Sequence, residues 1–179
     1  MEASGPEGPT SLVLLILDKS DNPKDVDEYD CIVSAEIPNP VSNPRLHELV
    51  TTHMLHGPCG PINPKCPCMV DGACKFKFPR DFLNETKQNA DGYPEYMRRD
   101  SNTTFTGKNG FSFDNRWVVP YNPYLLAKYE CHINVEVCTT VKAVKYLYKY
   151  GVPTAPHMSI PITELMHSTF SLHCFCHNF

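Results

Sequence analysis

The most regular pattern of apolar and polar positions lies in the segment Thr139–Gly151. Read at 100° per residue, its aliphatic side chains fall on one arc, and lysines and two tyrosines fall on the other. The pattern predicts an amphipathic helix that ends at Gly151 and Pro153. Tyr146 and Tyr150 are one helical turn apart, so their hydroxyl groups project from the same face.

The polar face of this predicted helix combines two phenols with ammonium groups. Lys142, Lys145 and Lys149 accompany Tyr146 and Tyr150. A nearby cation makes the phenolate of a tyrosine more accessible and offsets the charge of a phosphate. The same pattern fits an ordinary surface helix with half-buried rings and solvated lysines. Spacing alone leaves both interpretations open.

Shorter periodic stretches predict a mixture of strands and helices. A buried strand is expected at Leu12–Leu17, with further strands at Arg116–Val119 and His132–Val137. Helical spacing is found in Asp25–Glu36, Arg45–His56 and Tyr124–Tyr129, and a Gly-Lys-Asn-Gly turn predicts a hairpin between Thr103–Phe105 and Phe111–Phe113. The 17 prolines indicate that much of the path is irregular. The predicted fold class is therefore α+β and rich in loops.

Charge is distributed unevenly along the chain. The net charge is −4, yet residues 1–50 carry ten acidic and three basic side chains, whereas residues 51–179 carry ten and thirteen. A nucleic-acid face is therefore expected in the later part. The early apolar run is too short for a membrane span, and no positive region precedes it. We expect a nuclear or cytoplasmic protein that is neither secreted nor in a membrane.

Nine cysteines are an odd number, and several are grouped with histidine, glycine and proline. His56, Cys59, Cys68 and Cys74 follow the spacing His-x2-Cys-x8-Cys-x5-Cys. Four ligands of this kind suit a closed structural Zn²⁺ site, with Cys66 as a spare thiol. The spacing is not a standard zinc-finger pattern, so a loop of unligated thiols is an equal alternative.

Cations and aromatic rings alternate directly after Cys74. Lys75, Lys77 and Arg80 are interleaved with three phenylalanines, a pattern that can hold a phosphate backbone and stack on bases. It equally fits a strand with one solvated face, and that is the favoured local structure. The GxxxxGK[ST] spacing is absent throughout, so the sequence predicts no ATP site.

Alternation in His132–Val137 places His132, Asn134 and Glu136 on one strand face. Such a row can assist a catalytic metal. A structural hydrogen-bonded row is the favoured interpretation.

Five stretches carry a resemblance to a known family. They are YDCIVSAEIPNPVSNPRLHELV, MLHGPCGPINPKCPCMVDGACKFKFPRDF, DGYPEYMRRD, DNRWVVPYNPYLLAKYECHINVEVC and VKAVKYLYKY. In this order they resemble the Helitron helicase-like domain, the Rep-type portion of the Rep-helicase proteins of Helitron DNA transposons. The resemblance covers about residues 12–150, preceded by a disordered start (1–11) and followed by a divergent tail (151–179).

This resemblance implies a partial Rep-type antiparallel-sheet fold with an inserted zinc-binding subdomain. It also implies rolling-circle nicking of single-stranded DNA by a His-hydrophobic-His endonuclease that uses Mg²⁺ or Mn²⁺. Tyr146 and Tyr150 match the family's tyrosine pair, and Lys149 matches its lysine. His56, Cys59, Cys68 and Cys74 match its zinc ligands, and the position of Cys66 is usually a serine.

Three departures affect the functional prediction. The positions of the family's metal-binding histidines hold Thr10 and Leu12. The family's strands before that motif are missing, so we expect a domain that is incomplete at its N-terminal side, and the family pattern ends at Tyr150, before any helicase motor. We therefore expect a truncated derivative of the transposase that does not nick DNA by itself. The alternatives are a non-catalytic, zinc-dependent single-stranded DNA-binding module, an active tyrosine endonuclease if an upstream exon supplies the histidines, and a transposon relic without function.

Overall fold

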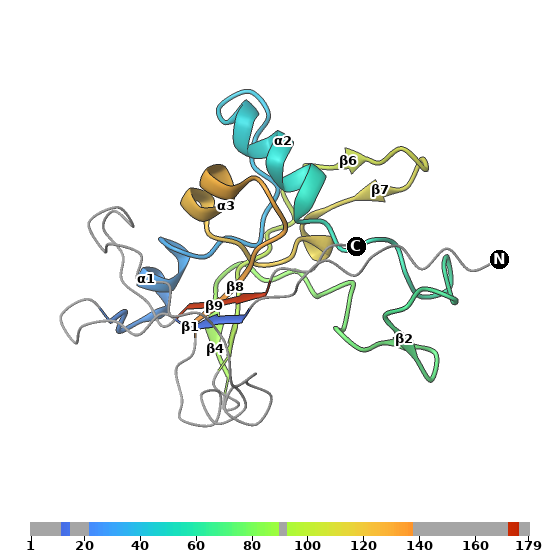
Figure 1. Cartoon of the computed structure of the whole chain (residues 1–179), viewed down its shortest axis with the longest axis horizontal. Coiled ribbons are helices and arrows are strands. Elements are labelled where there is room, and N and C mark those ends of the chain that lie inside the picture. The colour runs from blue at the N-terminus through green and yellow to red at the C-terminus, as the bar shows by residue number, and fades with distance from the viewer. Residues whose placement is uncertain (1–11, 15–21, 90–92, 138–171, 176–179) are drawn as a thin grey trace.

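The computed structural model describes residues 12–14, 22–89, 93–137 and 172–175. Short helices and small antiparallel sheets are joined by long irregular segments (Figure 1), in agreement with the predicted α+β class. The described elements are β1 (Leu12–Leu14), α1 (Val26–Asp30), α2 (Pro44–His53), β2 (Met69–Val70), β3 (Ala73–Cys74), β4 (Lys87–Gln88), β5 (Pro94–Glu95), β6 (Phe105–Thr106), β7 (Ser112–Phe113), the 3-10 helix η1 (Asn115–Trp117), α3 (Pro123–Tyr129), β8 (Asn134–Val137) and β9 (Leu172–Phe175).

Helix α1 is shorter than the sequence predicts. The Asp25 side chain caps its N-terminus, but the helix ends at Asp30 and does not continue to Glu36. The next residues, Ile32 and Val33, are buried in a core cluster with β8. Burial of these aliphatic side chains fixes the chain direction and overrides helical propensity.

Helix α2 also ends before its predicted end. It stops at His53, and Leu55 then forms an isolated antiparallel bridge with Val118. His56 therefore lies outside the helix, although the sequence predicts a helix that continues to it. The chain after the helix leads into the cysteine-rich segment, residues 56–74.

Helices α2 and α3 lie side by side and share one core (Figure 1). Asn122 begins α3 by accepting the N–H of Leu125 over 2.9 Å, and Pro123 occupies the first turn, where no N–H is needed. The buried side chains of this core are Ile37, Leu49, Val50, Met54, Val118, Val119, Tyr121 and Leu126.

The largest described sheet has the strand order β1-β9-β8, and all its pairs are antiparallel. It contains the first residues of the predicted 12–17 strand. In β8 the burial alternates as predicted, with Val135 and Val137 in the core. The predicted hairpin is confirmed as β6–β7, in which Phe105 pairs with Phe113.

Two predicted strands are wrong. Residues 75–82 form turns and irregular backbone, and Lys77 adopts a left-handed conformation with φ of 60°. The start of 116–119 belongs to η1, because the Asp114 side chain accepts the Arg116 N–H and caps that turn. At 75–82 a tertiary contact, the stacking of Phe78 on His56, overrides local alternation, whereas at 116–119 a local side-chain cap does so.

A buried arginine connects the irregular segments. Arg98 is 4% exposed, and its Nη1 donates to the carbonyl oxygens of Ala35 (3.2 Å), Asn115 (2.9 Å) and Val118 (2.6 Å). Its burial lowers the pKa of the guanidinium to about 10, which still leaves it charged near neutral pH. One guanidinium thus donates hydrogen bonds to three carbonyl groups that are not paired within a β-sheet.

None of the helices in the described residues is long and apolar enough to cross a membrane.

Candidate metal centre

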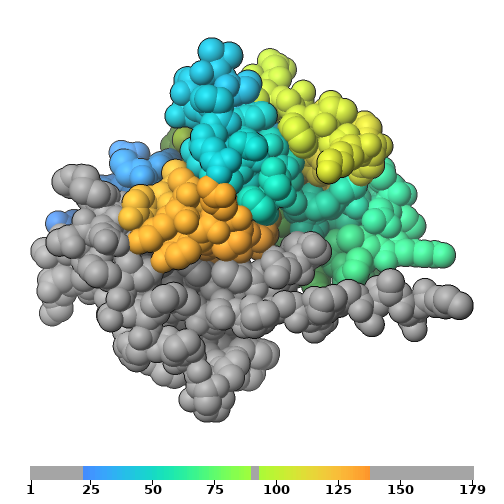
Figure 2. All heavy atoms as spheres, turned by 45° about the horizontal axis from the view of Figure 1, so that its top comes forward, coloured from blue at the N-terminus to red at the C-terminus, as the bar shows by residue number. Residues whose placement is uncertain are grey.

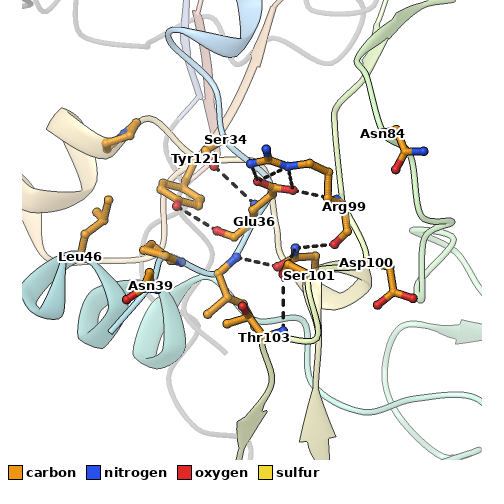
Figure 3. Close-up of a pocket in the computed structure, with 14 residues that line it drawn as sticks. Ser34, Glu36, Asn39, Leu46, Asn84, Arg99, Asp100, Ser101, Thr103 and Tyr121 are labelled. Atoms are coloured by element: carbon orange, nitrogen blue, oxygen red, sulfur yellow. Dashed lines mark hydrogen bonds and ion pairs between the residues drawn. The ribbon is translucent and has the colours of Figure 1, made fainter. Parts of the chain in front are cut away.

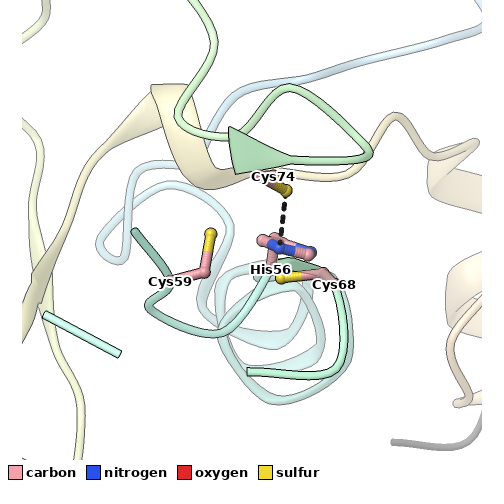
Figure 4. Close-up of side chains that lie close together, drawn as sticks. All are labelled: His56, Cys59, Cys68 and Cys74. Carbon is pink, nitrogen blue, oxygen red and sulfur yellow. Dashed lines mark hydrogen bonds between the residues drawn. The ribbon is translucent and has the colours of Figure 1, made fainter. Parts of the chain in front are cut away.

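The structure brings together the four side chains that the sequence predicts as zinc ligands (Figure 4). The ligand atoms of His56, Cys59, Cys68 and Cys74 all lie within 4.8 Å of one another. The Cys74 Sγ to His56 Nε2 distance is 3.6 Å. Zn–S and Zn–N bonds of about 2.3 and 2.0 Å require tetrahedral edges of about 3.5–3.8 Å. The cluster can therefore hold a metal ion such as zinc after only small movements.

The β2–β3 hairpin positions two of the ligands. Asp71 and Gly72 both have positive φ, at 51° and 81°, as a tight two-residue hairpin turn requires. Below the turn, Met69 pairs with Cys74, and the Lys75 N–H donates to the Cys68 carbonyl over 2.8 Å. The turn thereby brings the side chains of Cys68 and Cys74, six residues apart in the sequence, into the same cluster.

His56 is held from both its backbone and its ring. Its N–H donates to the Trp117 carbonyl over 2.9 Å, and its ring stacks on Phe78 with centroids 4.3 Å apart and planes 13° apart. Burial, together with the charges of His132 and Arg80, lowers the pKa of His56 to about 4. The imidazole is therefore neutral near pH 7, the form that binds a metal.

The thiols differ in how readily they ionise. Burial raises the pKa of Cys59 and of Cys68. Burial also opposes ionisation of Cys74, but hydrogen bonds with the backbone of Phe78 and Phe76 and with the neighbouring Cys59 and Cys68 thiols together lower its pKa. A divalent cation would reverse the cost of buried thiolates, so we expect metal binding to release protons.

Aromatic rings enclose the cluster on the side of the β6–β7 hairpin. Trp117 meets Phe111 edge to face at 5.2 Å and Phe113 at 6.1 Å, and these rings belong to the same buried cluster as Cys59 and Cys68. Four protein ligands in a dry setting leave no position for water or substrate. The arrangement therefore suits a structural site rather than a catalytic one.

The predicted DNA-binding residues near the cluster differ in exposure. Lys75 and Lys77 are exposed, and Lys75 Nζ lies 4.9 Å from the centre of the Phe76 ring. Arg80 is only partly exposed. Its guanidinium lies 5.4 Å from the centre of the Phe78 ring, and its Nε is buried without a hydrogen-bond partner among the described residues.

The remaining predicted residues cannot be placed. Lys142, Lys145, Tyr146, Lys149 and Tyr150 all lie outside the described residues, as does Thr10. Their roles stay predictions.

The polar face of β8 carries a row of interacting side chains. The side chains of Tyr96 and Asn134 hydrogen bond to Glu136, while burial raises the pKa of that carboxyl to about 7 despite the nearby Arg80 and Arg98. Among the described residues no second group of three or more potential metal ligands gathers. The Asn134 Oδ1 atom, however, is buried without a hydrogen-bond partner among the described residues, so the row has only part of the hydrogen bonding expected from the sequence.

A separate pocket of about 730 Å³ opens beside α2 (Figure 3). Glu36 and Arg99 form a bidentate ion pair in its wall, and the Tyr121 hydroxyl donates to the Glu36 carbonyl over 3.0 Å. Asn115 and Ser101 are among the other polar residues that line it. The sequence singled out none of these residues, because an Asn or Arg in a turn-rich stretch usually faces solvent.

No protein-family model matches the chain, and no curated protein is significantly similar to it. The resemblance to the Helitron helicase-like domain therefore stays a prediction.

Proposed function

We propose that the chain is a zinc-stabilised single-stranded DNA-binding domain derived from the Rep-type portion of Helitron proteins. The strongest support is that the His/Cys cluster leads directly into a basic loop, residues 75–77. Cys74, a ligand, is followed at once by Lys75, Phe76 and Lys77, and all three are exposed. A metal ion that fixes Cys74 would fix the start of this loop.

The local chemistry suits a nucleic-acid strand. Between His56 and Arg80 the chain carries four Lys or Arg residues against a single carboxylate, Asp71, in a protein whose net charge is −4. The ammonium groups of Lys75 and Lys77 would contact phosphates, and the exposed Phe76 ring would stack on a base. Figure 2 shows the cysteine-rich segment, in green, projecting at one edge of the molecule.

The zinc ion in this proposal has a structural role. His56, Cys59, Cys68 and Cys74 would hold it and leave it no open position for substrate. Free thiols of this kind persist in a reducing compartment, which fits the nucleus or cytoplasm. Nicking by Tyr146 or Tyr150, with Lys149 beside them, belongs to the parent family, and we propose that this chain binds DNA without cleaving it. The basis is that Thr10 and Leu12 replace the paired histidines that would hold Mg²⁺ or Mn²⁺.

Fluorescence anisotropy with a labelled oligo-dT tests the proposal. We expect salt-sensitive binding that weakens when Lys75 and Lys77 are both changed to Ala. The slope of log affinity against log salt should fall by about 1.4, because each lost phosphate contact on a single strand removes about 0.7.

The matched control removes two charges elsewhere. The Lys87→Ala, Lys108→Ala variant loses the same charge from exposed residues of β4 and of the β6–β7 turn. It should bind oligo-dT as the unchanged protein does. Equal loss in both double variants, or affinity that a zinc chelator leaves unchanged, would refute a zinc-positioned binding loop.

A further inference from the structure

A fifth thiol lies against the metal cluster without being one of its four ligands. Cys66 Sγ is 3.4 Å from Cys68 Sγ, and only Pro67 separates the two residues. Two hydrogen bonds hold the Cys66 backbone. Its N–H donates to the Asn63 carbonyl over 3.2 Å, and its carbonyl accepts the Met69 N–H over 2.9 Å. The contact between the sulfur atoms therefore arises from a fixed turn.

The two sulfur atoms differ in their access to solvent. Cys68 is 3% exposed, whereas Cys66 is only partly buried at the rim of the same cluster. Of these two sulfur atoms, Cys66 is therefore the one that a small oxidant from solvent can reach. Cysteine oxidation follows exposure, and a sulfenic acid condenses fastest with a thiol already in contact.

We propose that Cys66 is an oxidative modification site through which a hydroperoxide removes Cys68 from the metal. The proposal rests on the metal site of the proposed function and is independent of its DNA-binding role. The Cys66 sulfur takes one oxygen from the hydroperoxide, giving a sulfenic acid and releasing an alcohol, or water from hydrogen peroxide. The metal-bound Cys68 thiolate then attacks the Cys66 sulfur, the oxygen leaves as water after taking up a proton from solvent, and a Cys66–Cys68 disulfide forms. In total, one thiol and one thiolate lose two electrons and one proton, and the peroxide O–O bond is reduced.

Loss of Cys68 changes the coordination of the metal. The remaining ligands are His56, Cys59 and Cys74, which leave a fourth position open to water and lower the affinity for zinc. A disulfide between residues only two apart closes a small ring, and strained disulfides of this kind are readily reduced. Thiol reductants would therefore restore the site, so the reaction is reversible.

The test uses the full chain, purified without chelator and treated with one equivalent of hydrogen peroxide. Zinc release is followed with a chromogenic chelator, and the disulfide is followed by peptide mass mapping. We expect release of the bound zinc together with a mass decrease of about 2 Da in the peptide that contains Cys66 and Cys68. Cys66→Ser should release zinc at least about tenfold more slowly, because its serine hydroxyl forms no sulfenic acid.

Cys31→Ser provides the matched control, because Cys31 is an exposed thiol following α1, outside the cluster. It should release zinc at the unchanged rate. Release at that same rate from Cys66→Ser, or peptides in which Cys66 stays reduced after zinc has left, would overturn the proposal.

The two readouts separate this proposal from the zinc site on which it rests. Protein that contains no zinc before peroxide is added would contradict the metal site itself. A Cys66–Cys68 disulfide that forms in such protein would support the sulfur pairing and refute its role in metal release. Absence of that disulfide would refute the sulfur pairing as well as its role in metal release.

Discussion

The backbone N–H of Lys75 donates to the carbonyl oxygen of Cys68 over 2.8 Å. This hydrogen bond joins the first residue of the basic loop to the third residue of the predicted ligand set. Cys74, another member of that set, directly precedes Lys75. The geometry of the His/Cys cluster and the position of the loop therefore depend on each other.

Loss of one ligand should unfold the cysteine-rich segment. We expect about one zinc ion per chain in the unchanged protein and far less in Cys74→Ser. The free energy of unfolding should fall by at least about 3 kcal/mol, since binding energy at a structural zinc site is folding energy. Metal analysis by mass spectrometry and urea unfolding measure the two effects. Cys31→Ser should change neither, and a stable, zinc-free unchanged protein would contradict the prediction.

Replacement of Arg98 should be among the most destabilising changes in the protein. Arg98→Met keeps most of the side-chain volume but leaves the carbonyl groups of Ala35, Asn115 and Val118 without their donor. We expect a loss of about 3 kcal/mol or more, measured by urea unfolding. The neighbouring Arg99→Met removes an ion pair whose arginine is exposed, and it should cost less than about 1 kcal/mol. Similar losses for the two variants would argue against the buried network.

Acidification should destabilise the metal-free protein through His56. Its pKa is about 4 in the folded protein and about 6.5 when unfolded, so the unfolded state binds the proton first as the pH falls. The contribution is fully present above pH 6.5 and is lost down to about pH 4, by up to about 3 kcal/mol. Urea unfolding of the chelator-treated protein measures it. His56→Gln should lose this part of the pH dependence, and His53→Gln should retain it.

Glu136 should have the opposite dependence. Burial raises the pKa of its carboxyl to about 7, so the folded state holds a proton between pH 4.5 and 7 that the unfolded state has released. Stability contributed by the neutral acid is therefore lost as the pH rises through that range. Glu136→Gln should be close to neutral at pH 5 and should stabilise the protein at pH 8 by about 1 kcal/mol or more. Thermal unfolding at the two pH values checks the sign, and stabilisation only at low pH would refute it.

The sequence predicts the parts of the structure that depend on local chemistry. The ligand set is recognisable because histidine and cysteine recur among glycines and prolines that let the chain turn back on itself. The β6–β7 hairpin follows from its Gly-Lys-Asn-Gly turn, and the alternating burial of β8 follows from its pattern. Each of these features needs only neighbouring residues or a repeated spacing.

Features that depend on contacts between distant segments are not predictable in this way. Lys75–Phe82 alternates like a strand, yet its backbone turns at Lys77, and Phe78 stacks on His56. No periodicity indicates that Arg98, in a polar stretch, is buried against three carbonyl groups. The burial of such a side chain depends on segments more than 60 positions away in the sequence, such as the one that contains Ala35.

The three carbonyl groups bound by Arg98 have a consequence for the smallest piece of the protein that can fold. They come from the segment before α2 and from both ends of the turn that precedes α3. A cut anywhere between positions 35 and 118 would separate Arg98 from at least one of these carbonyl groups. The cysteine-rich segment produced as an isolated fragment would lack Arg98 and all three of them. The shortest autonomous unit therefore extends from before Ala35 to beyond Val118, and proteolytic nicks inside these limits should cause cooperative collapse of the whole unit.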